Sequence, residues 1–198
     1  HKGRQDLYRL QAPEKLENLR QVAVIQSVES SNRIEGVTAP PERLKALLAE
    51  KTTPQDRSEG EIAGYRDVLA TIHGAAMDIP FTDAVVLQLH RDLMKYSTQP
   101  GGAWKAAPNE IEEVRPDGTR FIRFDPTAPH LTPTAMADLH REFAAALKSG
   151  EHDPLILVPL YVLDFLCIHP FTDGNGRMAR LLSALALYQQ GYDVARYI

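Results

Sequence analysis

Residues 169–180 read His-Pro-Phe-Thr-Asp-Gly-Asn-Gly-Arg-Met-Ala-Arg, and they form a polar turn between two apolar runs at 155–168 and 181–188. The Gly-Asn-Gly segment permits positive φ and leaves backbone N–H groups uncovered by side chains. The helix after the turn is expected to begin at Gly176 or Arg177. Its unpaired N–H groups and the positive end of its dipole would then face the turn. A helix N-terminus of this kind binds anions, phosphate in particular.

Charged side chains in the turn add further groups that phosphate chemistry uses. Arg177 and Arg180 are three residues apart, which predicts one shared helix face. Cations in a first helical turn are disfavoured by roughly 0.3–1 kcal/mol each, a penalty that a bound polyanion would reverse. His169 is a proton acceptor tunable near neutral pH, and Asp173 is an oxygen ligand suited to magnesium shared with phosphates. A capped turn with surface salt bridges is the alternative, but the combination of all these groups favours a phosphate site.

This string resembles the motif of the Fic family, His-Pro-Phe-x-(Asp/Glu)-Gly-Asn-Gly-Arg-x-x-Arg, and it matches every fixed position. Most members that it resembles transfer AMP from ATP onto a hydroxyl group of a target protein. The resemblance implies that His169 takes the proton of that hydroxyl, and that Asp173 binds Mg²⁺ between the α- and β-phosphates of the substrate ATP. It assigns the phosphates as follows: Gly174, Asn175 and Gly176 hold the α-phosphate, Arg177 the β-phosphate and Arg180 the γ-phosphate.

A second match lies at the end of a helix predicted over about 13–33, where Ser31-Asn-Arg-Ile-Glu35-Gly36 occurs. It resembles the inhibitory motif of many Fic relatives, (Ser/Thr)-x-x-x-Glu-(Gly/Asn). The resemblance implies that Glu35 forms a bidentate ion pair with Arg180 and obstructs the γ-phosphate, with Ser31 one turn earlier on the same face. Alone, this three-position motif would suggest a solvated carboxylate at a helix end. The downstream motif favours the inhibitory interpretation.

A β-hairpin is predicted upstream of the motif, because Asp117-Gly118 separates apolar segments at 111–114 and 121–124. In Fic relatives a hairpin flap holds the target chain by strand addition. The resemblance therefore implies an unidentified target protein docked on the 111–124 hairpin, where edge-strand hydrogen bonds would position its backbone without reading its side chains. A hairpin without a binding role is the alternative.

The remaining periodic segments predict helices, so the expected fold class is all-α, a Fic-type helical bundle with one β-hairpin flap. The run 155–168 is apolar nearly all round, which predicts a central helix. Thr132 is expected to cap the helix that Pro133 opens, and His90 is expected to be an ordinary helical histidine. The predicted helices are about 13–33, 42–50, 55–73, 82–96, 133–149, 154–168 and 176–190.

The 198 residues suffice for one domain with an extension. We divide them into a tail at 1–12, an N-terminal helical region at 13–75 that carries the inhibitory motif, and a Fic domain core at 76–198. The net charge of −4 and the absence of a basic stripe argue against a nucleic acid partner. The lone Cys167 cannot form an internal disulfide and fits a reducing compartment. No signal peptide or membrane-length apolar stretch is visible, so a cytoplasmic location without a membrane partner is expected.

The expected function is thus that of an autoinhibited protein adenylyltransferase acting on a Ser, Thr or Tyr hydroxyl. Lysine in place of Gly176 marks relatives that act as kinases, so Gly176 argues against that activity. One alternative is a non-catalytic nucleotide-binding regulatory module, against which the intact His169 speaks. Another is a Fic enzyme that uses a different nucleotide or removes AMP. No HExxH motif, Cys cluster, P-loop lysine or Gly-x-Ser-x-Gly elbow offers a competing site. The sequence is compatible with either a monomer or an oligomer.

Overall fold

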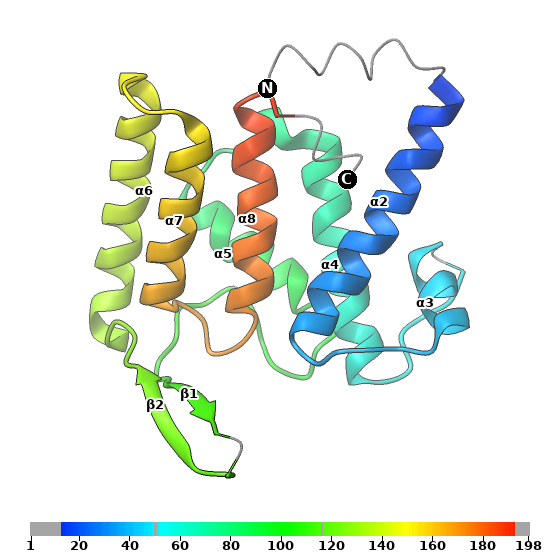
Figure 1. The fold of residues 1–198 in the computed structure, drawn as a ribbon, viewed down its shortest axis with the longest axis horizontal. Coiled ribbons are helices and arrows are strands. Elements are labelled where there is room, and N and C mark those ends of the chain that lie inside the picture. The colour runs from blue at the N-terminus through cyan, green and yellow to red at the C-terminus, as the bar shows by residue number, and fades with distance from the viewer. Residues whose placement is uncertain (1–12, 50, 116, 193–198) are drawn as a thin grey trace.

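The computed structural model describes residues 13–49, 51–115 and 117–192, so the predicted tail lies outside the described residues. Its helices and strands are α2 (Pro13–Ile34), α3 (Pro41–Leu48), α4 (Arg57–Ala75), α5 (Asp83–Leu93), β1 (Ile111–Val114), β2 (Arg120–Phe124), α6 (Thr132–Ser149), α7 (Pro154–Ile168) and α8 (Asn175–Gln189). Two short 3-10 helices cover Ala76–Asp78 and Pro129–Leu131. β1 and β2 pair antiparallel, and the all-α fold class with one hairpin is confirmed (Figure 1).

The starts of α4, α5 and α7 follow from their capping residues. The side chains of Asp56 and Asp153 accept hydrogen bonds from backbone N–H groups of α4 and α7, both at 2.8 Å, as preferred N-cap residues do. Thr132 is different, and its predicted capping role is wrong. It is the first residue of α6, and its hydroxyl donates to the carbonyl of Ala128 at 3.1 Å. The 3-10 turn at 129–131 runs directly into α6, so the chain already has a helical conformation at Thr132.

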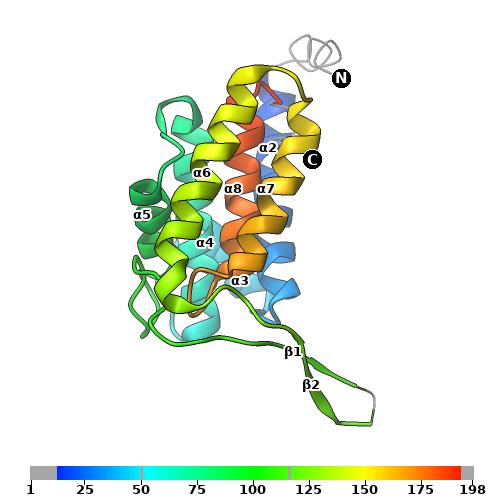
Figure 2. The ribbon, with the colours of Figure 1, turned by 90° about the vertical axis from the view of Figure 1, so that its left-hand side faces the viewer.

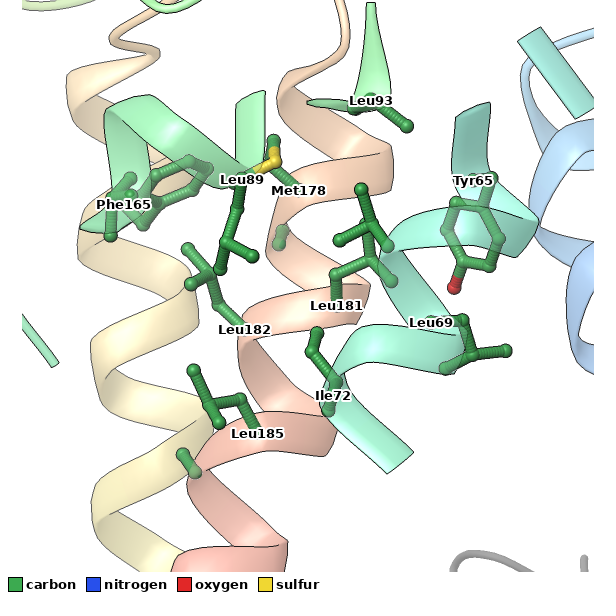
Figure 3. Close-up of a cluster of buried hydrophobic side chains, with 14 of the residues drawn as sticks. Tyr65, Leu69, Ile72, Leu89, Leu93, Phe165, Met178, Leu181, Leu182 and Leu185 are labelled. Carbon is green, nitrogen blue, oxygen red and sulfur yellow. The ribbon is translucent and has the colours of Figure 1, made fainter. Parts of the chain in front are cut away.

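α8 is the central helix of the bundle, packed against α7, α4 and α2 (Figures 1 and 2). Its Leu181, Leu182 and Leu185 are fully buried, and Figure 3 shows them among side chains of α4, α5 and α7. The labelled members of this cluster are Tyr65, Leu69, Ile72, Leu89, Leu93, Phe165, Met178, Leu181, Leu182 and Leu185. Burial of this apolar surface is the main stabilising term. This packing fixes the position of the N-terminal end of α8, where the motif lies.

The prediction of a central position for α7 is wrong. One face of α7 packs on α6 and α8, but four large aliphatic side chains on the other face are 42–59% exposed. Those residues are Leu155, Ile156, Leu160 and Leu163. Apolar composition alone cannot distinguish a helix surrounded on all sides from one at the edge of a layer.

Two glycines let α4 and the segment after α5 approach closely. A Cβ atom on Gly60 would lie 2.7 Å from the carbonyl oxygen of Tyr96, and one on Gly64 would collide with the carbonyl of Leu93. This contact sets the position of α5 against α4.

A single hydrophobic core includes side chains of both the 13–75 and the 76–192 segments. None of the helices in the described ranges combines the length and apolarity needed to cross a membrane.

Candidate active site

The turn between α7 and α8 is anchored from inside by Phe171 and Asn175. Phe171 is fully buried. The side chain of Asn175 accepts a hydrogen bond from the N–H of Phe171 at 2.9 Å and donates to its carbonyl at 2.7 Å. Both polar atoms of this amide are therefore engaged by the loop's own backbone. The side chain of Asn175 shapes the loop, and its backbone N–H is the group left for the α-phosphate contact expected from the sequence.

His90 of α5 supports the turn from one side, a role that sequence reasoning missed. Its ring stacks on Phe171 with centroids 3.7 Å apart. Its Nδ1 accepts a hydrogen bond from the N–H of Gly102 at 3.0 Å, so Nε2 carries the proton and donates to the carbonyl of Asp173 at 3.1 Å. Burial lowers the pKa of His90 to about 4. The ring is therefore neutral near pH 7, and this tautomer is the one that holds the loop.

A second brace comes from the segment before the hairpin. The ammonium group of Lys105 is buried and donates to the carbonyl of Ile168 at 3.0 Å and to Oδ1 of Asn109 at 2.7 Å. The amide of Asn109 donates to the carbonyls of His169 and Phe171, at 3.2 and 3.0 Å. These contacts satisfy the carbonyl of Ile168, which has no partner within α7, and two carbonyls of the turn that follows. They also fix the backbone on both sides of His169.

His169 ends α7 in the left-handed region, with φ 50° and ψ 59°. This conformation costs a non-glycine residue of the order of 1–2 kcal/mol, and such strain often marks functional positions. Nδ1 donates to the carbonyl of Leu166 at 3.3 Å, which leaves Nε2 as the lone-pair nitrogen. Burial lowers the pKa of His169, and the positive charge of Lys105 acts in the same direction. The ring is thus held neutral and able to accept a proton near pH 7.

Replacement of Lys105 by methionine should raise the pKa of His169, because it removes a nearby positive charge that disfavours the imidazolium. The expected role of His169 as a base requires a neutral ring, so an activity that depends on it should fall at the acidic end of the pH profile and recover as pH rises. The measurement is the acidic pKa in the dependence of kcat/KM on pH. Lys105→Arg is the matched control, since it keeps the charge. An unshifted acidic limb in Lys105→Met would contradict the electrostatic role.

The start of α8 presents the backbone donors for an anion. α8 begins at Asn175, one residue before the predicted start, and Gly174 precedes it with φ 81°. The first helical hydrogen bond is made by Met178, whose N–H donates to the carbonyl of Gly174 at 2.9 Å. The N–H groups of residues 175–177 therefore lack helical partners. The carboxylate of Glu35 lies directly against Gly176, where a Cβ atom would collide with it.

Arg180 is held by the end of α2. Its Nη2 donates to Oε1 of Glu35 at 2.8 Å and to the carbonyl of Ser31 at 2.9 Å, while its Nε donates to Oγ of Ser31 at 2.6 Å. Glu35 and Ser31 therefore meet Arg180 as expected. The expected bidentate pair is wrong, however, because Ser31 accepts the hydrogen bond of the second guanidinium nitrogen.

The expectation that Arg177 and Arg180 share one helix face is also wrong. Arg177 points to α4 instead and forms an ion pair with Glu61, Nη1 to Oε2, at 2.8 Å.

Asp173 is the carboxylate of the turn and is partly exposed. Its Oδ1 accepts from the N–H of Gly174 at 2.5 Å and from Arg177 at 3.3 Å, and its Oδ2 accepts from Arg57 at 3.4 Å. Within the described residues, no group of three or more His, Cys, Asp or Glu side chains could hold a metal ion. A single carboxylate fits Mg²⁺ only when phosphates and waters supply the other ligands, which is the usual arrangement in nucleotide sites.

A profile of the Fic/DOC family matches residues 80–187, which include the hairpin, the turn and most of α8. The chain belongs to the Fic/DOC family. It is similar to a protein adenylyltransferase Fic of Nematostella vectensis, with 28% identity over 185 residues, covering 86% of this chain and 39% of that protein. It is also similar to the protein adenylyltransferase fic-1 of Caenorhabditis briggsae, with 30% identity over 111 residues, covering 54% of this chain and 19% of that protein.

Among solved structures, a Fic domain containing signaling protein from Bacteroides thetaiotaomicron superposes with a TM-score of 0.79 and 27% identity. The match covers 91% of this chain and 68% of that one. The Fic-type helical fold is thereby confirmed. The aligned parts span well under half of the two curated adenylyltransferases, so this Fic domain corresponds to one portion of such proteins.

Proposed function

We propose that this Fic domain is a protein adenylyltransferase that transfers AMP from ATP to a Ser, Thr or Tyr hydroxyl of a target protein. One observation carries the proposal: His169, whose pKa burial lowers, and the N–H groups without helical partners at the start of α8 lie at the two ends of one braced turn. With this placement, the base can act on a hydroxyl group that attacks the same phosphorus atom whose oxygens the helix N–H groups bind. Relatives named as protein adenylyltransferases support the same reaction.

In the proposed reaction, the target hydroxyl oxygen attacks the α-phosphorus of ATP. Nε2 of His169 takes the hydroxyl proton, an O–P bond forms, and the bond to the β-phosphate breaks to release pyrophosphate. The N–H groups of residues 175–177 stabilise the negative charge that develops on the α-phosphate. Magnesium, bound by Asp173 together with the phosphates, would neutralise part of their charge. Arg177 and Arg180 bind the β- and γ-phosphates.

The resting domain is proposed to be inhibited by Glu35. Its carboxylate lies against Gly176 and pairs with Arg180, so it occupies the space and the cation that the nucleotide needs. Ser31 supports the arrangement, since it accepts two hydrogen bonds from the same arginine. ATP would bind poorly or in an unreactive pose until this carboxylate leaves.

The activity is tested by incubating the wild type and a Glu35→Gly variant with a candidate target and ATP labelled at either the α- or the γ-phosphate. Protein-bound label from α-labelled ATP alone is the expected result. Label from γ-labelled ATP would indicate a kinase. If ATP binds but neither label is transferred, the domain is a nucleotide-binding module and the proposal is wrong.

The hairpin is proposed to hold the target chain. Every residue of β2 is exposed, including the large apolar Phe121, Ile122 and Phe124. The hairpin projects from the same end of the bundle as the α7–α8 turn (Figures 1 and 2). A target segment that paired with an edge of this hairpin would be held by main-chain hydrogen bonds.

Deletion of residues 115–120, with a short glycine turn as replacement, should reduce modification of a protein target while sparing ATP binding. A tenfold reduction would correspond to about 1.4 kcal/mol of docking free energy. The measurement is the rate of target labelling beside the Kd for ATP. Equal losses in both assays would contradict a hairpin role confined to the target.

A further inference from the structure

Glu61 is a buried acidic residue that lies outside both the Fic motif and the segment matched by the family profile. It occupies the second turn of α4, and its side chain is 5% exposed. Its Oε2 is 2.8 Å from Nη1 of Arg177, whose side chain is 2% exposed. Carboxylates are rarely buried to this extent unless a cation accompanies them. The pair therefore links α4 to the first turn of α8.

Four charged side chains form a closed ring of alternating sign at this point. Arg57 donates to Oε1 of Glu61 at 2.7 Å, and Arg57 and Arg177 both reach Asp173, at 3.4 and 3.3 Å. The two contacts of Glu61 are the short ones, and those of Asp173 are the long ones. Glu61 is thus the fixed anion of the ring. Asp173 is the member most easily drawn away, as binding of magnesium would require.

Arg177 is buried, yet two of its guanidinium nitrogens lack a hydrogen-bond acceptor in the described part of the chain. Its Nε and Nη1 make no hydrogen bond within the described residues. The contact of Nη1 with Glu61 is therefore an ion pair without hydrogen-bond geometry. Buried donors are normally satisfied, so unsatisfied ones require an explanation. Both atoms are buried, so a phosphate oxygen would reach this guanidinium where Asp173, 3.3 Å from Nη2, moves away.

We propose that Glu61 is a positioning residue of the nucleotide site, which holds the guanidinium of Arg177 where the β-phosphate would meet it. The inference rests on the proposed function and adds to it, because the phosphate site is then completed by α4 from outside the matched segment. The negative charge of Glu61 offsets the cost of burying Arg177 before nucleotide arrives. Arg57 lies at the surface, 69% exposed, and contributes little to this burial.

The test compares ADP with AMP, because only ADP carries a β-phosphate. Binding of each nucleotide with Mg²⁺ is measured by calorimetry in the Glu35→Gly background, so that inhibition does not mask the effect. Glu61→Gln keeps the side-chain shape and removes the charge. It should weaken ADP binding by roughly tenfold, about 1.4 kcal/mol, while AMP binding changes little. Arg57→Gln, which alters the exposed partner of Glu61, is the matched control and should have a much smaller effect.

Two further variants make the test decisive. On an Arg177→Gln background, Glu61→Gln should have no additional effect on ADP binding, because its partner is gone. Glu61→Asp, which folds with its charge intact but shorter reach, should show a smaller ADP-selective loss and serves if Glu61→Gln fails to fold. Equal losses for ADP and AMP, or unchanged ADP binding, would overturn the positioning role and leave the proposed function intact. Absence of ADP and AMP binding in every protein tested, the Glu35→Gly parent included, would overturn both.

Discussion

Replacement of His169 by alanine should abolish AMP transfer while nucleotide affinity stays near that of the parent. General base catalysis contributes roughly 10²–10⁴-fold, so a loss in this range is expected. The reason is local: Nε2 is the lone-pair nitrogen of a ring that burial keeps neutral, and the phosphate donors belong to α8 instead. The measurement is label incorporation from α-labelled ATP in the Glu35→Gly background, beside the Kd for ATP.

The variant should fold normally, because the backbone contacts at this position do not depend on the imidazole. The N–H of His169 donates to the carbonyl of Phe165 at 2.9 Å, and its carbonyl accepts from Asn109. Thermal unfolding should therefore shift little. The exposed His152, which lies before α7, provides the matched control as His152→Ala. Transfer at the parent rate in His169→Ala would show that another group accepts the proton.

The parts of this site that could be predicted are those encoded in contiguous sequence. The string at 169–180 predicted the turn and the helix that follows it, while the base role of His169 and the metal role of Asp173 stay predictions. The short motif at the end of α2 predicted that Ser31 and Glu35 meet Arg180, 145 or more residues away. Helix spans followed from apolar spacing and capping signals, mostly to within a few residues. The hairpin followed from Asp117-Gly118 between its two apolar segments.

The parts that could not be predicted depend on contacts between distant elements. His90, Glu61 and Lys105 each brace the turn, and none of them stands in a pattern that differs from an ordinary helix or loop. Their roles follow from burial and from the partner that the fold brings to them. Arg177 and Arg180 illustrate the same limit. Spacing places them within one turn, but Arg177 pairs with a carboxylate on α4 and Arg180 with one just after α2, in different directions.

Replacement of Glu35 by glycine should raise AMP transfer and self-labelling by about 100-fold. The carboxylate of Glu35 lies against Gly176 and binds Arg180, and both groups are proposed to bind the phosphates of ATP. A free-energy difference of about 2.7 kcal/mol between blocked and open states would hold activity down to this degree. Each partner is about one-third exposed, so the ion pair alone contributes little to stability. Inhibition would therefore result from occupancy of the site, with little loss of stability in the variant.

The same variant has a second, smaller consequence that must be separated from the first. The negative charge of Glu35 raises the pKa of His169, so its removal should lower that pKa and improve activity at acidic pH. Rates are therefore compared at pH 8, where the histidine is neutral in both proteins. Glu29→Gln, on α2 and paired with Arg33, is the control for altered charge near this end of α2.

Addition of Arg180→Ala to Glu35→Gly should remove most of the gain, because the guanidinium released by the first change is the group proposed to hold the γ-phosphate. In the wild-type background, Arg180→Ala alone should not activate, since the carboxylate would still lie against the start of α8. This asymmetry separates release of a phosphate-binding arginine from simple loosening of α2, which would activate in both cases. Equal labelling rates for wild type and Glu35→Gly would show that Ser31 to Gly36 is an ordinary helix end.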